Sequence, residues 1–97
     1  MILTLKETKE WLRMDEEDED STIELLIQAA EEYLKNATGR VFDSTNNQAR
    51  LFCLILVTEW FENRDMIGSK VSEKVRFSVQ SMLLQLQYSE EGEVTNG

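Results

Sequence analysis

The chain has 97 residues, enough for one modest hydrophobic core and therefore for a single domain. It contains no proline and only four glycines, and it is rich in Leu, Glu, Lys and Ala, a composition that favours helices joined by short polar loops. With 10 basic and 19 acidic residues its net charge is −9, which argues against binding to a phosphate backbone, because proteins that bind nucleic acids usually carry a basic patch.

The first predicted helix covers residues 5–14. Thr4 and Glu7 match a capping box, in which the threonine hydroxyl accepts a backbone hydrogen bond and the glutamate reaches back to the cap. Trp11 and Leu12 fall on the apolar face of this helix and charged side chains on the others. This pattern is typical of a short surface helix.

Six consecutive acidic residues, Asp15 to Asp20, follow this helix. A calcium-binding EF-hand loop that began at Asp15 would need glycine at its sixth position and glutamate at its twelfth, where this chain has Asp20 and Leu26. Like charges in such a block repel one another, and acidic residues just before a helix interact favourably with its N-terminal dipole. The block therefore predicts a solvated loop rather than a calcium site.

The second predicted helix covers residues 20–38. Ser21 and Glu24 form another potential capping box, although an aspartate just before them could cap the helix instead. Gly39 suits the left-handed conformation that ends many helices. The apolar residues recur at the spacing of one continuous stripe: Ile23, Leu26, Ile27, Ala30, Tyr33, Leu34 and Ala37.

The third predicted helix covers residues 46–64 and is apolar on nearly every face from Leu51 to Val57. We expect the other helices to surround it, because a helix that is hydrophobic all round must be buried. It ends with two large aromatics, Trp60 and Phe61, one turn before the permanent charge of Arg64. This combination suits a protein interface; the alternative is that both aromatics are core residues and the arginine makes a local ion pair.

Met66 and Ile67 lie beside a glycine, which predicts either a contact loop or two residues folded back onto the core. The last predicted helix covers residues 72–88, with Ser72 as its N-cap. One apolar face of this helix suits the core, and a second face suits contact with another subunit. The second face comprises Phe77, Leu84 and Tyr88.

Residues 89–97 are polar and lack periodicity, which predicts a flexible acidic tail after a domain of residues 1–88. The expected fold is all-α: a small orthogonal or bundle-like domain of four helices around a buried central third helix. The apolar run is far shorter than the roughly 20 residues of a membrane span, and no signal peptide is recognisable, so we expect a soluble intracellular protein without membrane contact.

Catalytic patterns find no match in the sequence. Histidine is absent and Cys53 is the single cysteine, so neither a zinc site nor a Cys-His pair can form. The carboxylates fall on predicted loops and solvent faces, and no glycine-rich phosphate loop or serine elbow appears. We therefore expect no enzymatic activity, no metal and no cofactor.

Several segments, in matching order, resemble one known family. They are the opening residues Leu3, Thr4, Lys9, Leu12 and Arg13, the acidic stretch Asp15 to Asp20, the helix residues Ile23, Leu26, Ile27, Ala29 and Ala30, the turn Thr38-Gly39, and Phe61-Glu62-Asn63-Arg64-Asp65. This order resembles the head-tail connector family of tailed bacteriophages, also called DNA-packaging adaptors. Two departures concern the last helix, which lacks a preceding proline and has Gln85-Leu86-Gln87 where the family commonly has a Q-L-R string.

The resemblance implies a small α-helical, non-enzymatic adaptor that forms a dodecameric ring beneath the portal once DNA is packaged. Such a ring extends the DNA channel and receives a stopper or tail-completion protein. The implied location is the virion, at the head-tail interface, and the host cytoplasm during assembly. DNA would pass without specific binding, because a negative lumen repels it. Isolated subunits could be monomeric when the portal template is absent.

Under this hypothesis, two groups of residues carry the contacts. The expected subunit or partner interface, or its support, comprises Trp60, Phe61, Arg64, Met66, Ile67, Phe77, Leu84 and Tyr88. The expected portal-docking tail comprises Ser89, Glu90, Glu91 and Val94. The alternative function is a small acidic regulatory protein that sequesters a basic partner or mimics the charge of DNA.

Overall fold

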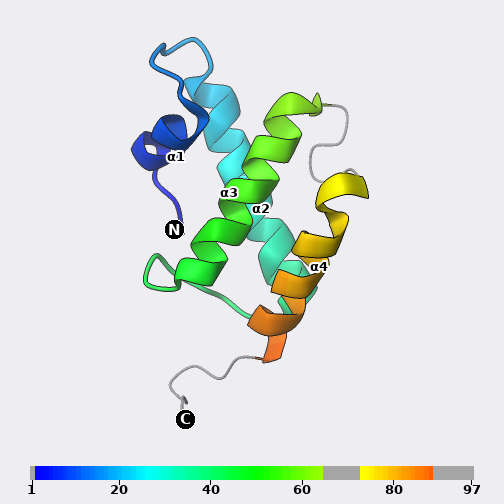
Figure 1. Ribbon diagram of the computed structural model, residues 1–97. Coiled ribbons are helices and arrows are strands. Elements are labelled where there is room, and N and C mark those ends of the chain that lie inside the picture. Colours follow the sequence, from blue (N-terminus) through cyan, green and yellow to red (C-terminus); the bar gives the residue numbers. More distant parts are fainter. Residues whose placement is uncertain (1, 65–72, 89–97) are drawn as a thin grey trace.

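The computed structural model describes residues 2–64 and 73–88, apart from the Lys74 side chain. These residues form four helices and no strand: α1 (Leu5–Leu12), α2 (Asp20–Thr38), α3 (Asn47–Glu62) and α4 (Glu73–Tyr88) (Figure 1). The predicted all-α fold is confirmed. The predicted bounds of α2 are confirmed at both ends, and those of the other helices differ by at most two residues at either end.

Side chains cap two of the helix starts. At α1 the Thr4 Oγ1 accepts a hydrogen bond from the Glu7 N–H at 3.2 Å, and the Glu7 carboxylate accepts one from the Thr4 N–H at 2.8 Å, so the predicted capping box is confirmed. Asn46 caps α3 by accepting a bond from the Ala49 N–H at 3.0 Å. The prediction of a capping box at Ser21 was wrong: the N-cap of α2 is Glu19, whose side chain makes no capping bond, and Ser21 lies within the first turn.

Left-handed residues end the first two helices. Arg13 has a φ of 62°, and the N–H groups of Arg13 and Met14 bond back to Glu10 and Lys9, which is the Schellman pattern. This turn ends α1 earlier than the sequence predicted. At the end of α2, Gly39 has a φ of 73°, as expected for a residue without a Cβ.

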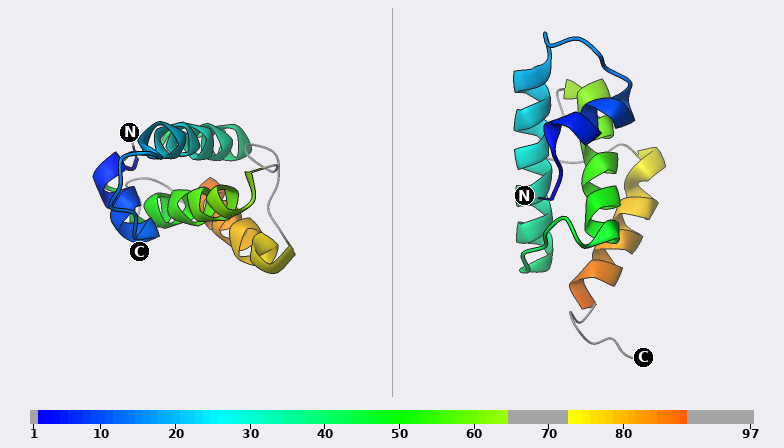
Figure 2. Two further views of the ribbon diagram at one scale, coloured as in Figure 1. Left: turned by 90° about the horizontal axis from the view of Figure 1, so that it is seen from above. Right: turned by 90° about the vertical axis from the view of Figure 1, so that its left-hand side faces the viewer.

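The four helices form a small bundle. α2 and α3 run antiparallel and side by side, and α1 and α4 pack against opposite sides of this pair, each in contact with both helices (Figures 1 and 2). α2 and α3 each contact all three other helices. Among the described residues, α3 provides six of the fifteen buried core residues and α2 provides five, so these two helices form the centre of the bundle.

The core contains apolar side chains from the N-terminal segment and from α2, α3 and α4. Its buried members are Ile2, Leu3, Ile23, Leu26, Ile27, Ala30, Leu34, Ala49, Phe52, Cys53, Leu56, Val57, Trp60, Val79 and Leu86. The Tyr33 ring packs edge-on against Trp60, with 5.8 Å between centroids, and lies 6.3 Å from Phe52. One side of α3 is not covered, since Leu51 is exposed. The expectation of an all-round buried third helix therefore holds for most of its faces but not for this one.

Polar bonds attach α1 and the N-terminal segment to this core. Glu7 pairs with Arg50 of α3, and Lys9 pairs with Asp20 of α2 at 2.8 Å. The backbone N–H groups of Ile2 and Leu3 donate to the Glu31 carboxylate at 2.8 and 3.2 Å. These bonds hold a short helix that would be marginal alone.

Candidate interaction surfaces

The outer face of α4 is the clearest unpartnered apolar surface of the described residues. Phe77, Leu84 and Tyr88 are 79%, 57% and 73% exposed, respectively, whereas Val79 and Leu86 on the opposite face are buried. The three exposed residues recur at i, i+7 and i+11, so they share one side of the helix. We call this surface, Phe77, Leu84 and Tyr88, the α4 stripe.

The α4 stripe is also free of charge. No Asp, Glu, Lys or Arg occurs from residue 77 to residue 88, although these residue types make up 30% of the chain. An exposed helix face normally carries charged side chains, so this uncharged apolar stripe is a candidate surface for contact with another protein. The periodicity of the sequence alone predicted that these three residues share a second apolar face of the helix.

The end of α3 divides the predicted interface residues between core and surface. Trp60 is fully buried, so it is a core residue and could support an interface only through its neighbours. Phe61 is partly buried, and the Arg64 guanidinium lies 5.2 Å from the centre of its ring. Arg64 also pairs with Glu19 at 3.2 Å, linking the end of α3 to the start of α2. The local ion pair offered as the alternative is therefore present, while the arginine side chain is still half exposed.

The outer face of α2 holds a surface that sequence reasoning missed. Leu25 is 57% exposed, and a shallow hollow of about 390 Å³ lies farther along the helix. The hollow is lined by Ala29, Glu32, Tyr33, Asn36 and Ala37. The predicted core stripe had included Ala37, which is exposed, and Tyr33, which is partly buried. The available signal was Leu25, an apolar residue that does not fit the core periodicity.

A second missed surface lies where α1 meets α3. Trp11, expected on the apolar face of a surface helix, is exposed, and its indole Nε1 donates to Thr58 Oγ1 at 2.7 Å. The exposed Leu51 lies on the same outer side of α3 as Thr58, two turns away. Trp11 and Leu51 are each less exposed than any of the three residues of the α4 stripe.

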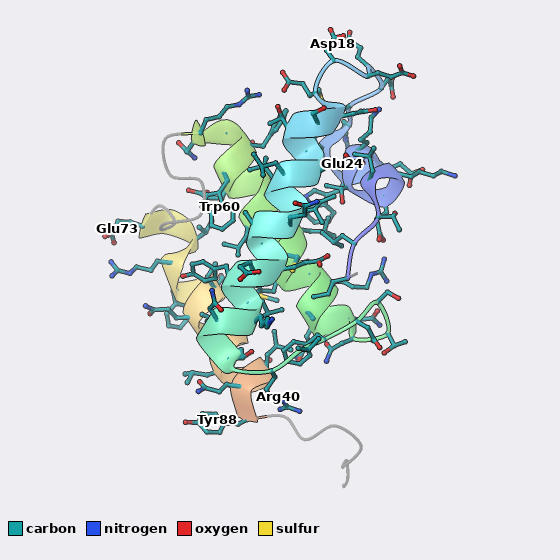
Figure 3. The ribbon with its side chains drawn as sticks, turned by 180° about the vertical axis from the view of Figure 1, so that it is seen from behind. Asp18, Glu24, Arg40, Trp60, Glu73 and Tyr88 are labelled. Atoms are coloured by element: carbon teal, nitrogen blue, oxygen red, sulfur yellow. The ribbon has the colours of Figure 1, made fainter. Side chains whose placement is uncertain are left out.

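The acidic stretch forms a loop at the end of the molecule where α2 begins, and Figure 3 shows Asp18 at its tip. Its last two residues, Glu19 and Asp20, pair with Arg64 and Lys9. The carboxylates of residues 15–18 are exposed. No group of three or more His, Cys, Asp or Glu side chains is arranged to hold a metal ion within the described residues.

The cysteine is not a reactive centre in the folded chain. Cys53 is buried in the core, and burial, with a smaller contribution from the nearby Glu31 charge, raises the pKa of its thiol to about 12. Only the thiolate is a nucleophile, so this group stays unreactive at neutral pH. It acts as a small apolar core residue.

Three groups of predicted residues lie outside the described part of the chain. They are Met66 and Ile67, the N-cap Ser72, and the tail residues Ser89, Glu90, Glu91 and Val94. None of the described helices has the length and apolar character needed to cross a membrane.

Comparison with models of known protein families gives a match over most of the chain. The family model described as "Phage gp6-like head-tail connector protein" matches residues 2–89. This range includes all four helices and the α4 stripe. No curated protein and no solved structure matches the chain.

Proposed function

Because this chain belongs to the phage gp6-like head-tail connector family, we propose that it is a non-enzymatic adaptor forming a ring between portal and tail. The ring extends the DNA channel and completes the head after packaging. Its place is the virion, at the head-tail interface, and its other partners are the portal protein and a stopper or tail-completion protein. The observation that carries the ring is the α4 stripe, an uncharged apolar surface on an otherwise highly charged chain.

A ring requires side-to-side contacts that repeat in one direction. Contacts between two different surfaces of identical subunits close into a ring when the rotation fits. The α4 stripe is suited to be one of these two surfaces, because its aromatic and aliphatic side chains gain free energy when they leave water. The half-exposed Arg64 and the partly buried Phe61, at the end of α3 beside the acidic loop, are a further candidate contact between subunits.

The charge of the chain fits a channel protein. Each subunit carries −9, and the carboxylates of residues 15–18 are exposed in one loop. Negative surfaces around a channel repel the DNA backbone, so DNA slides through without binding. The tail residues Ser89, Glu90, Glu91 and Val94 complete the proposal as the segment that docks on the portal.

A direct test combines purified portal protein with the full chain and with a chain lacking residues 89–97. The full chain should co-purify with the portal and form rings visible by electron microscopy, and removing the tail should weaken binding. Absence of both binding and rings for the full chain would refute the adaptor. Capture of a basic partner instead would favour a small acidic regulatory protein.

Substitutions in the α4 stripe test the ring contact separately. Phe77→Ser and Leu84→Ser should abolish rings without unfolding the subunit, because both side chains are already exposed in the monomer. Val41→Ser provides the matched control, since Val41 is an equally apolar residue that is 81% exposed but lies outside α4. Rings that survive both α4 substitutions would show that another surface joins the subunits.

A further inference from the structure

We propose that the α4 stripe of one subunit docks along the outer face of α2 of the next subunit, with the two helices parallel. This inference rests on the proposed ring and names the surface that receives the stripe. The receiving surface consists of Leu25, Ala29, Tyr33 and Ala37, together with the hollow beside them. We call it the α2 ridge. Its occupant is a second copy of this chain.

The α2 ridge has a shape that accepts large side chains. Its four residues recur every four positions, so they form one of the continuous rows that pack into the grooves of a neighbouring helix. Two of them are alanines, which leave the hollow of about 390 Å³ next to the Tyr33 ring. Contacts with Trp60 and Phe52 hold that ring in place from the core side. The α4 stripe offers the opposite shape, with two aromatic rings and a leucine projecting into solvent.

The two surfaces also match in length. From Phe77 to Tyr88 the helix rises about 16 Å, and from Leu25 to Ala37 about 18 Å, at 1.5 Å per residue. If Phe77 lies beside Leu25 with the helices parallel, the equal spacing along both helices places Leu84 next to Glu32 and Tyr88 next to Asn36. Both positions line the hollow.

Ring symmetry favours the parallel arrangement. α2 and α4 run in the same direction within one subunit, from the top to the bottom of Figure 1. α4 packs against both α2 and α3, and its stripe lies on the side opposite the buried Val79 and Leu86, so the stripe faces away from its own subunit. In a cyclic assembly whose axis follows the helices, every subunit has the same orientation along that axis. The outer α4 of one subunit then meets the outer α2 of the next in parallel.

Charge is low along the α4 side of this contact. Glu73 and Arg76, the described charged side chains of α4, lie in its first turn, are opposite in sign and pair with each other at 3.2 Å. The uncharged stretch from residue 77 to residue 88 adds no repulsion between subunits that each carry −9.

The size of the contact indicates that two subunits alone associate weakly. Three side chains of this size, exposed by half to four-fifths, bury on the order of 400 Å² on one partner, whereas a stable pair buries about 800 Å² per partner. The free chain should therefore be monomeric at moderate concentration. Ring closure, or a portal that holds neighbouring subunits together, supplies the additional stabilisation.

Cross-linking between two singly substituted chains tests this register. Glu73→Cys is mixed in turn with Ser21→Cys, Asn36→Cys or Glu62→Cys, on assembled portal rings, with a short bismaleimide. All four positions are exposed; Asn36 lines the hollow, and the other three lie outside the α4 stripe and the α2 ridge. The native Cys53 is buried and does not compete. Each chain carries one accessible thiol, so every mixed product is between subunits.

The expected result is a mixed product of Glu73→Cys with Ser21→Cys that exceeds the other two several-fold. A dominant product with Asn36→Cys would show an antiparallel contact, and one with Glu62→Cys would show that the stripe docks on the outer side of α3. Either result overturns the inference. Rings that form on the portal without the Ser21 product also overturn it while leaving the adaptor function intact. If no rings form, the adaptor function has failed first.

Leu25→Ser and Leu51→Ser form a matched pair for a second test. Both leucines are about half exposed in the monomer, but only Leu25 belongs to the α2 ridge. Leu25→Ser should reduce the yield of rings several-fold, and Leu51→Ser should leave it unchanged. Equal yields from the two variants would exclude α2 as the receiving surface, even if both variants melt at the native temperature.

Discussion

Replacing Arg64 with alanine separates folding from assembly at the end of α3. In the folded subunit this arginine makes two partly exposed contacts, an ion pair with Glu19 and a contact with the Phe61 ring. A solvent-exposed ion pair contributes about 0.2–1 kcal/mol, and an exposed cation–π contact contributes about 0.5–1 kcal/mol. The substitution should therefore lower the free energy of unfolding by about 1–1.5 kcal/mol, and the melting temperature of a domain this size by about 5–10 °C.

Thermal and urea unfolding followed by circular dichroism measure this loss. Arg76→Ala is the control, because Arg76 is similarly exposed and, among the described residues, pairs only with Glu73 at i,i+3, a pair worth about 0.2–0.5 kcal/mol. A loss for Arg64→Ala no larger than that of the control would show that its two tertiary contacts do not stabilise the fold. High salt should reduce the difference between the variants, because it screens the Glu19 pair.

Assembly on the portal provides the second measurement. Thr4→Ala removes the N-cap of α1 and should cost about 1 kcal/mol, so it matches Arg64→Ala in stability. Because Arg64 is proposed as part of the subunit contact, Arg64→Ala should reduce ring formation much more than Thr4→Ala does. Equal loss of rings in both variants would mean that the arginine acts only through the stability of the subunit.

The remaining predictions concern the subunit alone. The Thr4 backbone hydrogen bond and the Arg50 charge lower the pKa of Glu7, so as the pH falls Glu7 binds its proton first in the unfolded chain. The contribution of Glu7 to stability should therefore be present above its ordinary pKa of 4.5 and lost below it. Glu7→Gln should reduce the pH dependence of the urea-unfolding midpoint measured from pH 6 to pH 3. Arg13→Gly should raise the free energy of unfolding by up to about 1 kcal/mol in the same urea assay, because glycine adopts the left-handed conformation without steric cost; a clear loss would show that the arginine side chain stabilises the fold. Cys53, whose pKa is raised to about 12, should not react with Ellman's reagent at pH 8 until guanidinium unfolds the chain, and rapid reaction of the folded chain would contradict its burial.

Local patterns in the sequence determined the helices and the α4 stripe. The capping box of Thr4 and Glu7 and the glycine after α2 depend only on neighbouring residues, so they could be read directly. The spacing of Phe77, Leu84 and Tyr88 placed them on one side of their helix, and the structure finds that side exposed. The family also followed from short motifs in order, which the match to a connector family bears out.

Tertiary packing decided what periodicity cannot express. A pattern of apolar residues shows which side of a helix is buried, but it does not show how far neighbouring helices extend along that side. Trp60 is fully buried, with the Tyr33 ring packed edge-on against it, and Glu59 is almost fully buried in a helix whose sequence gives no sign of it. The ends of the helices bring Arg64 to Glu19 across 45 positions of sequence. The α2 ridge likewise exists only because no described segment of the folded chain covers Leu25, and that depends on where α1 and α4 pack.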